Sequence, residues 1–192
     1  QRKNQNWKGC IVTNPNCTST GMTISLKPLL DVFGIDQVMA VSLQALSGAG
    51  YPGVSSMDIL DNVVPFIKGE EEKVESEPLK MLGKVGKTSI EKAGFVISAH
   101  TNRVAVSDGH TVCVSIKCGK NVNPKDAVEV MRAYECPEIS RDLPSAPNPV
   151  IKIFEESDRP QPRLDRSIGR GMTTSVGRMR VDPIFGLKYI VL

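Results

Sequence analysis

The sequence predicts an α/β (α+β) fold in which helices flank a mixed β-sheet. Helix-like and strand-like segments alternate in the first half of the chain, and strand-like segments dominate the second half, as expected for such a sheet. The chain has 192 residues, 40% of them hydrophobic and 23% charged, which suffices to bury one core. The clearest segments are an amphipathic stretch at 22–33 and an alternating stretch at 111–117.

The first predicted helix follows a short polar stretch that contains a cysteine. Apolar side chains recur at helical spacing over 22–33. Pro28 should kink or split this helix, and Gly34 should end it. The candidate N-terminal caps are Asn16, Thr18 and Ser19. The other elements predicted up to residue 106 are strands at 9–13, 36–46, 95–99 and 103–106, a glycine-rich loop at 47–53, and helices at 55–62 and 70–87.

A hairpin is the main feature predicted for the middle of the chain. Asp108 and Gly109 form a two-residue turn signal. The turn would pair Ser107 with His110. Arg103 would then share their face, about four strand steps or roughly 13 Å from His110. The remaining predicted elements are the strand at 111–117, a helix at 124–134, a loop at 137–149, a strand at 150–154, an irregular segment at 158–170, and strands at 172–181 and 187–192.

Composition excludes several classes of function. The net charge is only +3 and there is no long basic run, so the sequence indicates neither nucleic-acid binding nor an anionic membrane surface. No apolar stretch is long enough to span a bilayer, and no signal-peptide pattern opens the chain. The five cysteines are odd in number and lack zinc or redox spacing, so we expect reduced thiols, a cytoplasmic protein and no metal site.

Cys17 is the first candidate for chemistry. A thiol at a helix N-terminus lies beside free backbone N–H groups and the positive end of the helix dipole, which favour the nucleophilic thiolate. The same N–H groups could hold an oxyanion or a phosphate. From this stretch alone, an unreactive buried loop cysteine is the commoner alternative. His110, one of only two histidines, is the candidate proton partner, or else an ordinary polar residue at a strand end.

Three further segments have competing interpretations. Arg103 could bind a carboxylate through its planar fork, or it could be a surface arginine. The acidic run that ends in Lys73 is, on the residues alone, a solvated first helical turn. Residues 48–53 match GxGxxG, but Pro52 and Gly53 would spoil the helix that must hold a pyrophosphate, so we interpret them as a loop near the site.

Together these residues resemble the aspartate-semialdehyde dehydrogenases, most closely their fungal and archaeal branch. The resemblance covers nearly the whole chain, and it depends on the order and spacing of several short pieces. The pieces are Asn16-Cys17-Thr18, Gln44 followed by Ser47-Gly48-Ala49-Gly50, the Glu-rich stretch ending in Lys73, and Arg103 seven residues before His110. The resemblance implies that residues 1–192 are the catalytic and dimerisation domain of a glyceraldehyde-3-phosphate dehydrogenase-like enzyme. It also implies that two parts of the enzyme lie outside this chain: an N-terminal Rossmann domain, which would bind most of the NADPH, and a C-terminal helix. The chain starts at Gln1 instead of a methionine and stops in an apolar strand-like run at 186–192, which likewise suggests a fragment. We expect this fragment to be inactive alone.

The resemblance also implies a reaction and a set of roles. The reaction is NADPH-dependent reduction of β-aspartyl phosphate to L-aspartate 4-semialdehyde, with release of phosphate, by a homodimer or homotetramer in the biosynthesis of lysine, threonine and methionine. The implied roles are Cys17 as nucleophile, His110 as general acid/base, Gln44 orienting the intermediate, Arg103 and Glu70 binding the substrate carboxylate and ammonium, Lys73 and Asn16 contacting phosphate, and Ser47, Gly48, Ala49 and Gly50 approaching the nicotinamide.

Three alternatives remain open from the sequence. An N-acetylglutamyl-phosphate reductase would share the thioester chemistry but would not need the ammonium contact expected of Glu70. A cysteine hydrolase or acyltransferase could use Cys17 and His110 without a nicotinamide cofactor. The domain could also have no catalytic role and only mediate the assembly of subunits.

Overall fold

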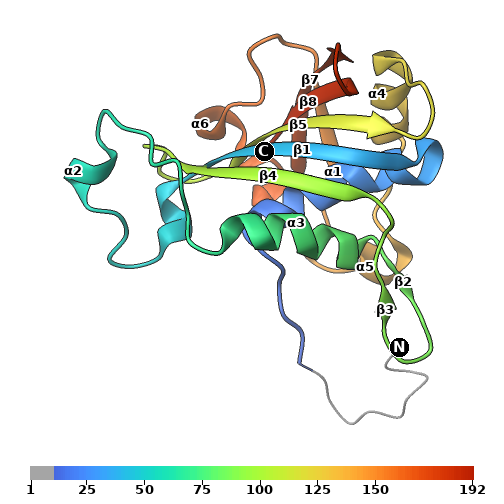
Figure 1. The fold of residues 1–192 in the computed structure, drawn as a ribbon, viewed down its shortest axis with the longest axis horizontal. Helices are drawn as coiled ribbons and strands as arrows, with labels where there is room; N and C mark the ends of the chain where they lie inside the picture. Colours follow the sequence, from blue (N-terminus) through green and yellow to red (C-terminus); the bar gives the residue numbers. More distant parts are fainter. Residues whose placement is uncertain (1–10) are drawn as a thin grey trace.

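A six-stranded mixed sheet organises the structure (Figure 1). The computed structural model describes residues 11–192. The strands run in the order β4-β1-β5-β8-β7-β6, with β1 parallel to β4, β6 parallel to β7, and the other neighbours antiparallel. The fold class predicted from the sequence is therefore confirmed. The sheet strands are β1 Ile35–Gln44, β4 Val96–Arg103, β5 Thr111–Cys118, β6 Ile151–Phe154, β7 Thr174–Asp182 and β8 Gly186–Val191.

Three helices accompany the sheet, and shorter elements connect them. The long helices are α1 Cys17–Phe33, α3 Glu70–Met81 and α4 Pro124–Arg132. The short elements are η2 Leu46–Ala49, α2 Ser56–Ile59, α5 Glu138–Arg141, α6 Pro162–Asp165, η3 Ile168–Gly171, and the two-stranded ribbon of β2 Lys84–Val85 and β3 Ile90–Glu91. None of the helices within 11–192 combines the length and apolarity needed to cross a membrane.

The core lies on one face of the sheet. Alternate side chains of β1, β4, β5 and β8 point to this face, where α1 and α4 bury their apolar sides. Helix α3 runs along β4 (Figure 1). Within residues 11–192, no helix covers the opposite face. There Met39, Leu43 and Val96 are 38%, 37% and 62% exposed. One side of the sheet thus supplies the core, and the other is a free surface with apolar side chains.

Helix α1 begins at the cysteine and is continuous. The Asn16 side chain caps it by accepting the Ser19 N–H at 3.1 Å, and Gly34, at φ +70°, ends it. We expected Pro28 to kink or split this helix, and the split is wrong. Pro28 is buried beside Leu26 and Leu29, both 0% exposed, so core packing offsets the backbone hydrogen bond that proline removes, a cost of roughly 3 kcal/mol in a helix interior.

The hairpin predicted around Asp108 and Gly109 is wrong. Residues 95–106 contain the single strand β4, and β1 lies between β4 and β5, pairing with each. Ser107 therefore does not pair with His110 across a two-stranded turn. The turn signal reflected a real bend, with Gly109 at φ +92°, but a bend does not specify which strands become neighbours.

Other boundaries also differ from the prediction. The helix predicted at 70–87 ends at Met81, because a Cβ on Gly83 would lie 2.2 Å from the Glu91 carbonyl oxygen, a contact that only glycine permits as the chain enters the ribbon. The helix predicted at 55–62 is reduced to α2, and the predicted loop at 137–149 contains α5. Of the strand predicted at 9–13, residues 9–10 lie outside the described part, and 11–13 are not in a strand.

The turn between β7 and β8 is organised by Asp182. Its Oδ1 accepts the N–H groups of Ile184 at 2.8 Å and Phe185 at 3.0 Å, and its Oδ2 accepts the Ser115 hydroxyl at 2.9 Å. Burial acts to raise the pKa of this carboxyl. The two amides, Ser115 and the nearby Lys188 ammonium outweigh it and lower the pKa to about 2.

We expect Asp182→Ala to lower the free energy of unfolding at pH 7 by about 1–3 kcal/mol, because its donors lose their acceptor. The folded-state pKa of Asp182 lies below its ordinary value of 3.8, so its contribution is complete above that value and is lost as pH falls through about 2. Urea denaturation from pH 7 to pH 2 should show the gap between wild type and variant closing only at the acid end. Asp142→Ala, which removes an exposed carboxylate, is the control. A gap independent of pH would contradict the prediction.

Candidate active site

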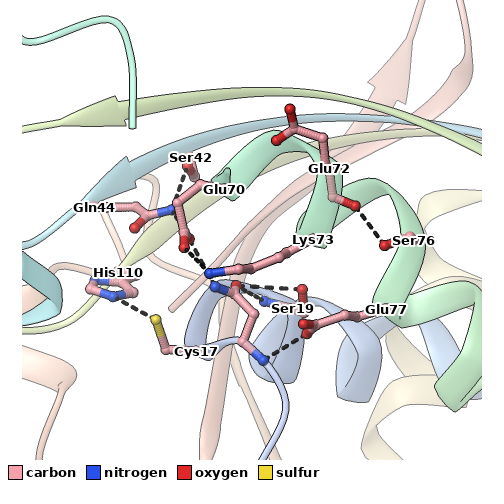
Figure 2. A network of polar contacts seen from close by, with 11 residues as sticks. Cys17, Ser19, Ser42, Gln44, Glu70, Glu72, Lys73, Ser76, Glu77 and His110 are labelled. Carbon is pink, nitrogen blue, oxygen red and sulfur yellow. Dashed lines mark hydrogen bonds and ion pairs between the residues drawn. The ribbon is translucent and has the colours of Figure 1, made fainter. Parts of the chain in front are cut away.

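Cys17 and His110 meet at the N-terminus of α1 (Figure 2). The Cys17 side chain is exposed, and its Sγ lies 3.1 Å from Nε2 of His110. Cys17 is the first residue of α1, so its thiol is placed at the end of the helix that carries free N–H groups. The alternative of a cysteine buried in a loop is therefore wrong. The four cysteines within 11–192 have free thiols.

His110 is held from the side opposite Cys17. Its Nδ1 accepts the backbone N–H of Ala45 at 3.0 Å, which comes directly after β1. Burial lowers the pKa of His110, and the Arg103 guanidinium lowers it further, against the opposing effects of the Asp108 and Glu70 carboxylates. The imidazole thus lies between the residue that follows β1 and the first residue of α1.

Glu70 is the centre of a second cluster, on α3 (Figure 2). Its Oε2 accepts hydrogen bonds from Asn16 Nδ2 at 2.8 Å and Gln44 Nε2 at 3.1 Å, and its Oε1 lies 3.3 Å from Lys73 Nζ. Burial acts to raise the pKa of Glu70, but Asn16, Gln44 and Lys73 lower it overall. The interpretation of this run as a solvated helical turn is therefore wrong for Glu70, whose side chain is 12% exposed.

Arg103 is a buried residue rather than a surface arginine. It ends β4, is 6% exposed, and donates from Nη1 to the Ala45 carbonyl oxygen at 2.6 Å. A Cβ on Gly48 would lie 3.0 Å from both Arg103 Nη1 and His110 Nε2, so these two atoms are within about 6 Å of each other. The separation of roughly 13 Å expected from the hairpin is wrong, because β4 and β5 approach the site from opposite sides of β1.

A cavity of about 370 Å³ opens beside the thiol. Four of the predicted site residues line it: Cys17, Ser47, Gly48 and His110. The other predicted site residues do not line it: Asn16, Gln44, Ala49, Gly50, Glu70, Lys73 and Arg103. The Ser47 hydroxyl donates a hydrogen bond to Oδ1 of Asp108, another residue of the cavity lining, at 2.9 Å. Within 11–192, no group of three or more His, Cys, Asp or Glu side chains is arranged to hold a metal ion.

Three glutamates on α3 position this site and were missed by the sequence analysis. Glu77 Oε2 accepts the Asn16 N–H at 2.6 Å, next to the nucleophile. Glu71 and Glu75 accept the N–H groups of Thr101 and Ala99, at 3.1 and 3.0 Å, along the free edge of β4. Their spacing of four residues, which places two carboxylates on one helix face, was the available signal. These contacts fix α3 against β4, and hence Glu70 against Gln44.

Comparisons with known proteins agree with this geometry. A family model described as semialdehyde dehydrogenase, dimerisation domain, matches residues 26–192. An aspartate-semialdehyde dehydrogenase from Archaeoglobus fulgidus is 53% identical over 192 residues, covering 100% of this chain and 54% of the relative. One from Schizosaccharomyces pombe is 49% identical over 198 residues, covering 100% of this chain and 56% of the relative.

A solved structure agrees as well. Aspartate semialdehyde dehydrogenase with NADP from Candida albicans matches with a TM-score of 0.82 and 42% sequence identity, over 92% of this chain and 50% of that chain. The chain therefore spans about half the length of the curated relatives it matches. The resemblance inferred from the short motifs is confirmed, and the chain belongs to the semialdehyde dehydrogenase family, whose dimerisation domain it matches over residues 26–192.

Proposed function

We propose that residues 1–192 are the catalytic and dimerisation domain of a cytoplasmic aspartate-semialdehyde dehydrogenase. The enzyme would reduce β-aspartyl phosphate to L-aspartate 4-semialdehyde with NADPH and release phosphate, in the biosynthesis of lysine, threonine and methionine. The observation that carries the proposal is Cys17 Sγ at the start of α1, 3.1 Å from Nε2 of His110, in a cavity beside a glycine loop. The relatives at 53% and 49% identity support the same assignment.

The chemistry begins at Cys17. Its thiolate attacks the acyl carbonyl and expels phosphate, which leaves a thioester on the sulfur. When bound, NADPH supplies a hydride to the thioester carbon. Collapse of the resulting adduct on Cys17 re-forms a C=O bond, releases the aldehyde and returns the thiolate. His110 and the α1 N–H groups lie where negative charge on sulfur or oxygen needs hydrogen-bond donors.

Other residues would bind and orient the substrate. Arg103 uses Nη1 for Ala45, and its remaining N–H groups would bind the α-carboxylate. Glu70 would take the ammonium group, Gln44 would orient the intermediate, and Lys73, together with Asn16, would contact phosphate. The hydrogen bonds that join Glu70 to Asn16 and Gln44 support a common site for these groups.

The glycine loop fits the reactive end of NADPH. Ser47 and Gly48 line the cavity beside Cys17, and Gly48 leaves open the space that a Cβ would close against His110. A flat nicotinamide ring can approach such small residues. We keep Ala49 and Gly50 in the proposed contact as the exposed continuation of this loop. Residues 48–53 do not open a helix, which leaves the pyrophosphate to the proposed Rossmann domain.

The test is phosphate-dependent reduction of NADP by the full-length parent enzyme with aspartate semialdehyde. We expect reduction with this substrate and none with N-acetylglutamate semialdehyde, whose blocked amine cannot pair with Glu70. Reduction of NADP with the N-acetylated substrate alone would favour the N-acetylglutamyl-phosphate reductase alternative. Hydrolysis of an acyl substrate without cofactor would favour the cysteine hydrolase, and no turnover of either kind would favour an assembly role.

We also propose that a second copy covers the free sheet face, giving a homodimer or a dimer of dimers. The match to a dimerisation domain and the exposure of Met39, Leu43 and Val96 on that face support it. We expect Val96→Lys to shift the parent enzyme toward monomer in sedimentation velocity, because it places a charge in an apolar contact. Val85→Lys, at a valine on the ribbon that is 71% exposed against 62% for Val96, should leave the assembly unchanged. An unchanged sedimentation coefficient for Val96→Lys would contradict the proposal.

A further inference from the structure

The bend before His110 is held from two sides. On one side lies the glycine loop, where Ser47 donates its N–H to the Ser107 carbonyl oxygen at 3.0 Å and its hydroxyl to Asp108 Oδ1 at 2.9 Å. On the other side lies α6, which Arg166 follows directly. Arg166 Nη1 donates to the Ser107 hydroxyl at 2.9 Å and to the Asp108 carbonyl oxygen at 3.3 Å. One guanidinium nitrogen carries two N–H groups, so it can serve both acceptors.

Direct packing also joins α6 to this bend. Gly109 lies in the bend with φ +92°. A Cβ at this position would lie 3.3 Å from the Cβ atoms of both Pro162 and Arg166, and 3.3 Å from Leu192 Cδ1. The backbone of the bend therefore passes against α6 with little room to spare. The hydrogen bonds of Arg166 act across a contact that is already closely packed.

Helix α6 is in turn anchored to the far strands of the sheet. The side chain of Asp165 is 0% exposed and forms a two-point ion pair with Arg159, with Nε at 2.8 Å and Nη2 as the second donor. The Arg159 guanidinium lies 4.8 Å from the centre of the Phe154 ring in β6. A Cβ on Gly177 in β7 would lie 2.2 Å from the Arg159 carbonyl oxygen. Because Arg166 comes directly after Asp165, it connects β6 and β7 to the bend before His110.

We infer that Arg166 is a positioning residue, which holds the bend so that His110 stays within hydrogen-bond distance of Cys17. The inference rests on the proposed function, in which these two side chains carry the reaction. His110 lies directly before β5, so the sheet fixes its backbone on one side and the bend fixes it on the other. The Nε2–Sγ distance of 3.1 Å depends on both. A displacement of about 1 Å caused by a distant mutation can cost about 10²-fold in rate.

Arg166 acts on the bend and not on the ligands. Asp108, Gly109 and His110 line the cavity beside the Cys17 thiol, and Arg166 does not. Its loss should therefore change the rate of the chemical step and leave the affinity for substrate and cofactor as it was. This separates it from Arg103, whose proposed contact with the substrate carboxylate predicts a change in KM as well.

Arg166→Gln in the full-length parent enzyme is the first test. Glutamine is uncharged and too short to reach both acceptors, so we expect kcat to fall by about 10- to 100-fold. The KM values for aspartate semialdehyde, NADP and phosphate should stay within about twofold of wild type, because no ligand contact is removed. Arg163→Gln, at an exposed arginine of the same helix, removes the same charge and should retain wild-type kcat. Equal kcat in the two variants, or a raised KM with unchanged kcat in Arg166→Gln, would overturn the inference.

A double-mutant cycle tests whether Arg166 acts through the bend. Ser107→Ala removes one acceptor at an exposed position, so this variant should fold even if Arg166→Gln does not. We expect Ser107→Ala to lower kcat by about threefold or more, and to add less than about twofold to the loss in Arg166→Gln, since the two side chains share one contact. Arg166→Lys keeps a charged donor and should recover part of the loss. Wild-type kcat in Ser107→Ala, or single effects that multiply in full, would overturn the inference.

Alkylation of Cys17 in the full-length parent gives a readout that needs no turnover. The rate with iodoacetamide at pH 7 can be followed by mass spectrometry of the Cys17 peptide. We expect Arg166→Gln to slow it by about threefold or more relative to Arg163→Gln, because a neighbouring imidazole favours the reactive thiolate. In His110→Asn enzyme, adding Arg166→Gln should change the rate no further. An equal rate in the two arginine variants, or a further fall in the His110→Asn background, would overturn the inference. A parent without dehydrogenase activity would contradict the proposed function, and the alkylation rates would still decide whether Arg166 positions His110.

Discussion

Replacing Cys17 with alanine is expected to abolish turnover of the full-length parent enzyme, by more than about 10⁴-fold in kcat, while leaving the fold intact. The loss should be this large because no thioester can form without the sulfur. Among residues 11–192, Cys17 is the cysteine in contact with His110. The fold should persist because Cys17 is exposed at the first position of α1, and the cap made by Asn16 does not involve its side chain.

Activity and far-ultraviolet circular dichroism should be measured together on the variant. Cys136→Ala is the matched control, since Cys136 is also a free thiol but lies in the loop after α4, outside the sheet. It should retain normal turnover. Wild-type turnover in Cys17→Ala would contradict the covalent mechanism. Equal losses of turnover in both cysteine variants would indicate that the effect is not specific to Cys17.

The second large effect is expected for Arg103→Leu. This substitution should lower kcat/KM by about 10²- to 10³-fold, because it removes the buried charge that we propose binds the substrate carboxylate. It also removes the hydrogen bond to the Ala45 carbonyl, which positions the donor to His110. The effect should therefore appear in kcat as well as in KM. Steady-state kinetics with aspartate semialdehyde, NADP and phosphate measure both.

Arg163→Leu is the control for the loss of positive charge, because Arg163 is exposed on α6. The split between KM and kcat separates the two roles of Arg103. A raised KM with unchanged kcat would attribute the effect to carboxylate binding alone, and a fall in kcat would attribute part of it to the positioning of His110 through Ala45. If kcat/KM is unchanged, Arg103 has no part in substrate binding.

Short-range patterns in the sequence determined most of the secondary structure. Helical periodicity located α1, and Asn16 and Gly34 marked its ends, because a cap depends on residues within one turn of it. The alternation over 111–117 gave β5, because side chains of a strand alternate between two faces whatever its neighbours are. The cap candidates and the helical spacing after them likewise placed Cys17 at a helix start, and the presence of only two histidines made His110 its candidate partner.

Only the tertiary structure decided how these pieces meet. The parallel pairing of β1 with β4 inserts β1 between β4 and β5, which brings Arg103 and His110 to the two sides of Gly48. The Asp108-Gly109 turn signal favoured a hairpin of the two strands that flank it. A local signal cannot show that β1, which lies far from it in the sequence, pairs with both of those strands. Burial of Glu70 and the hydrogen bond from Ala45 N–H to His110 arise from the same long-range packing. Every residue except proline has a backbone N–H, so the sequence does not show which of them will contact His110.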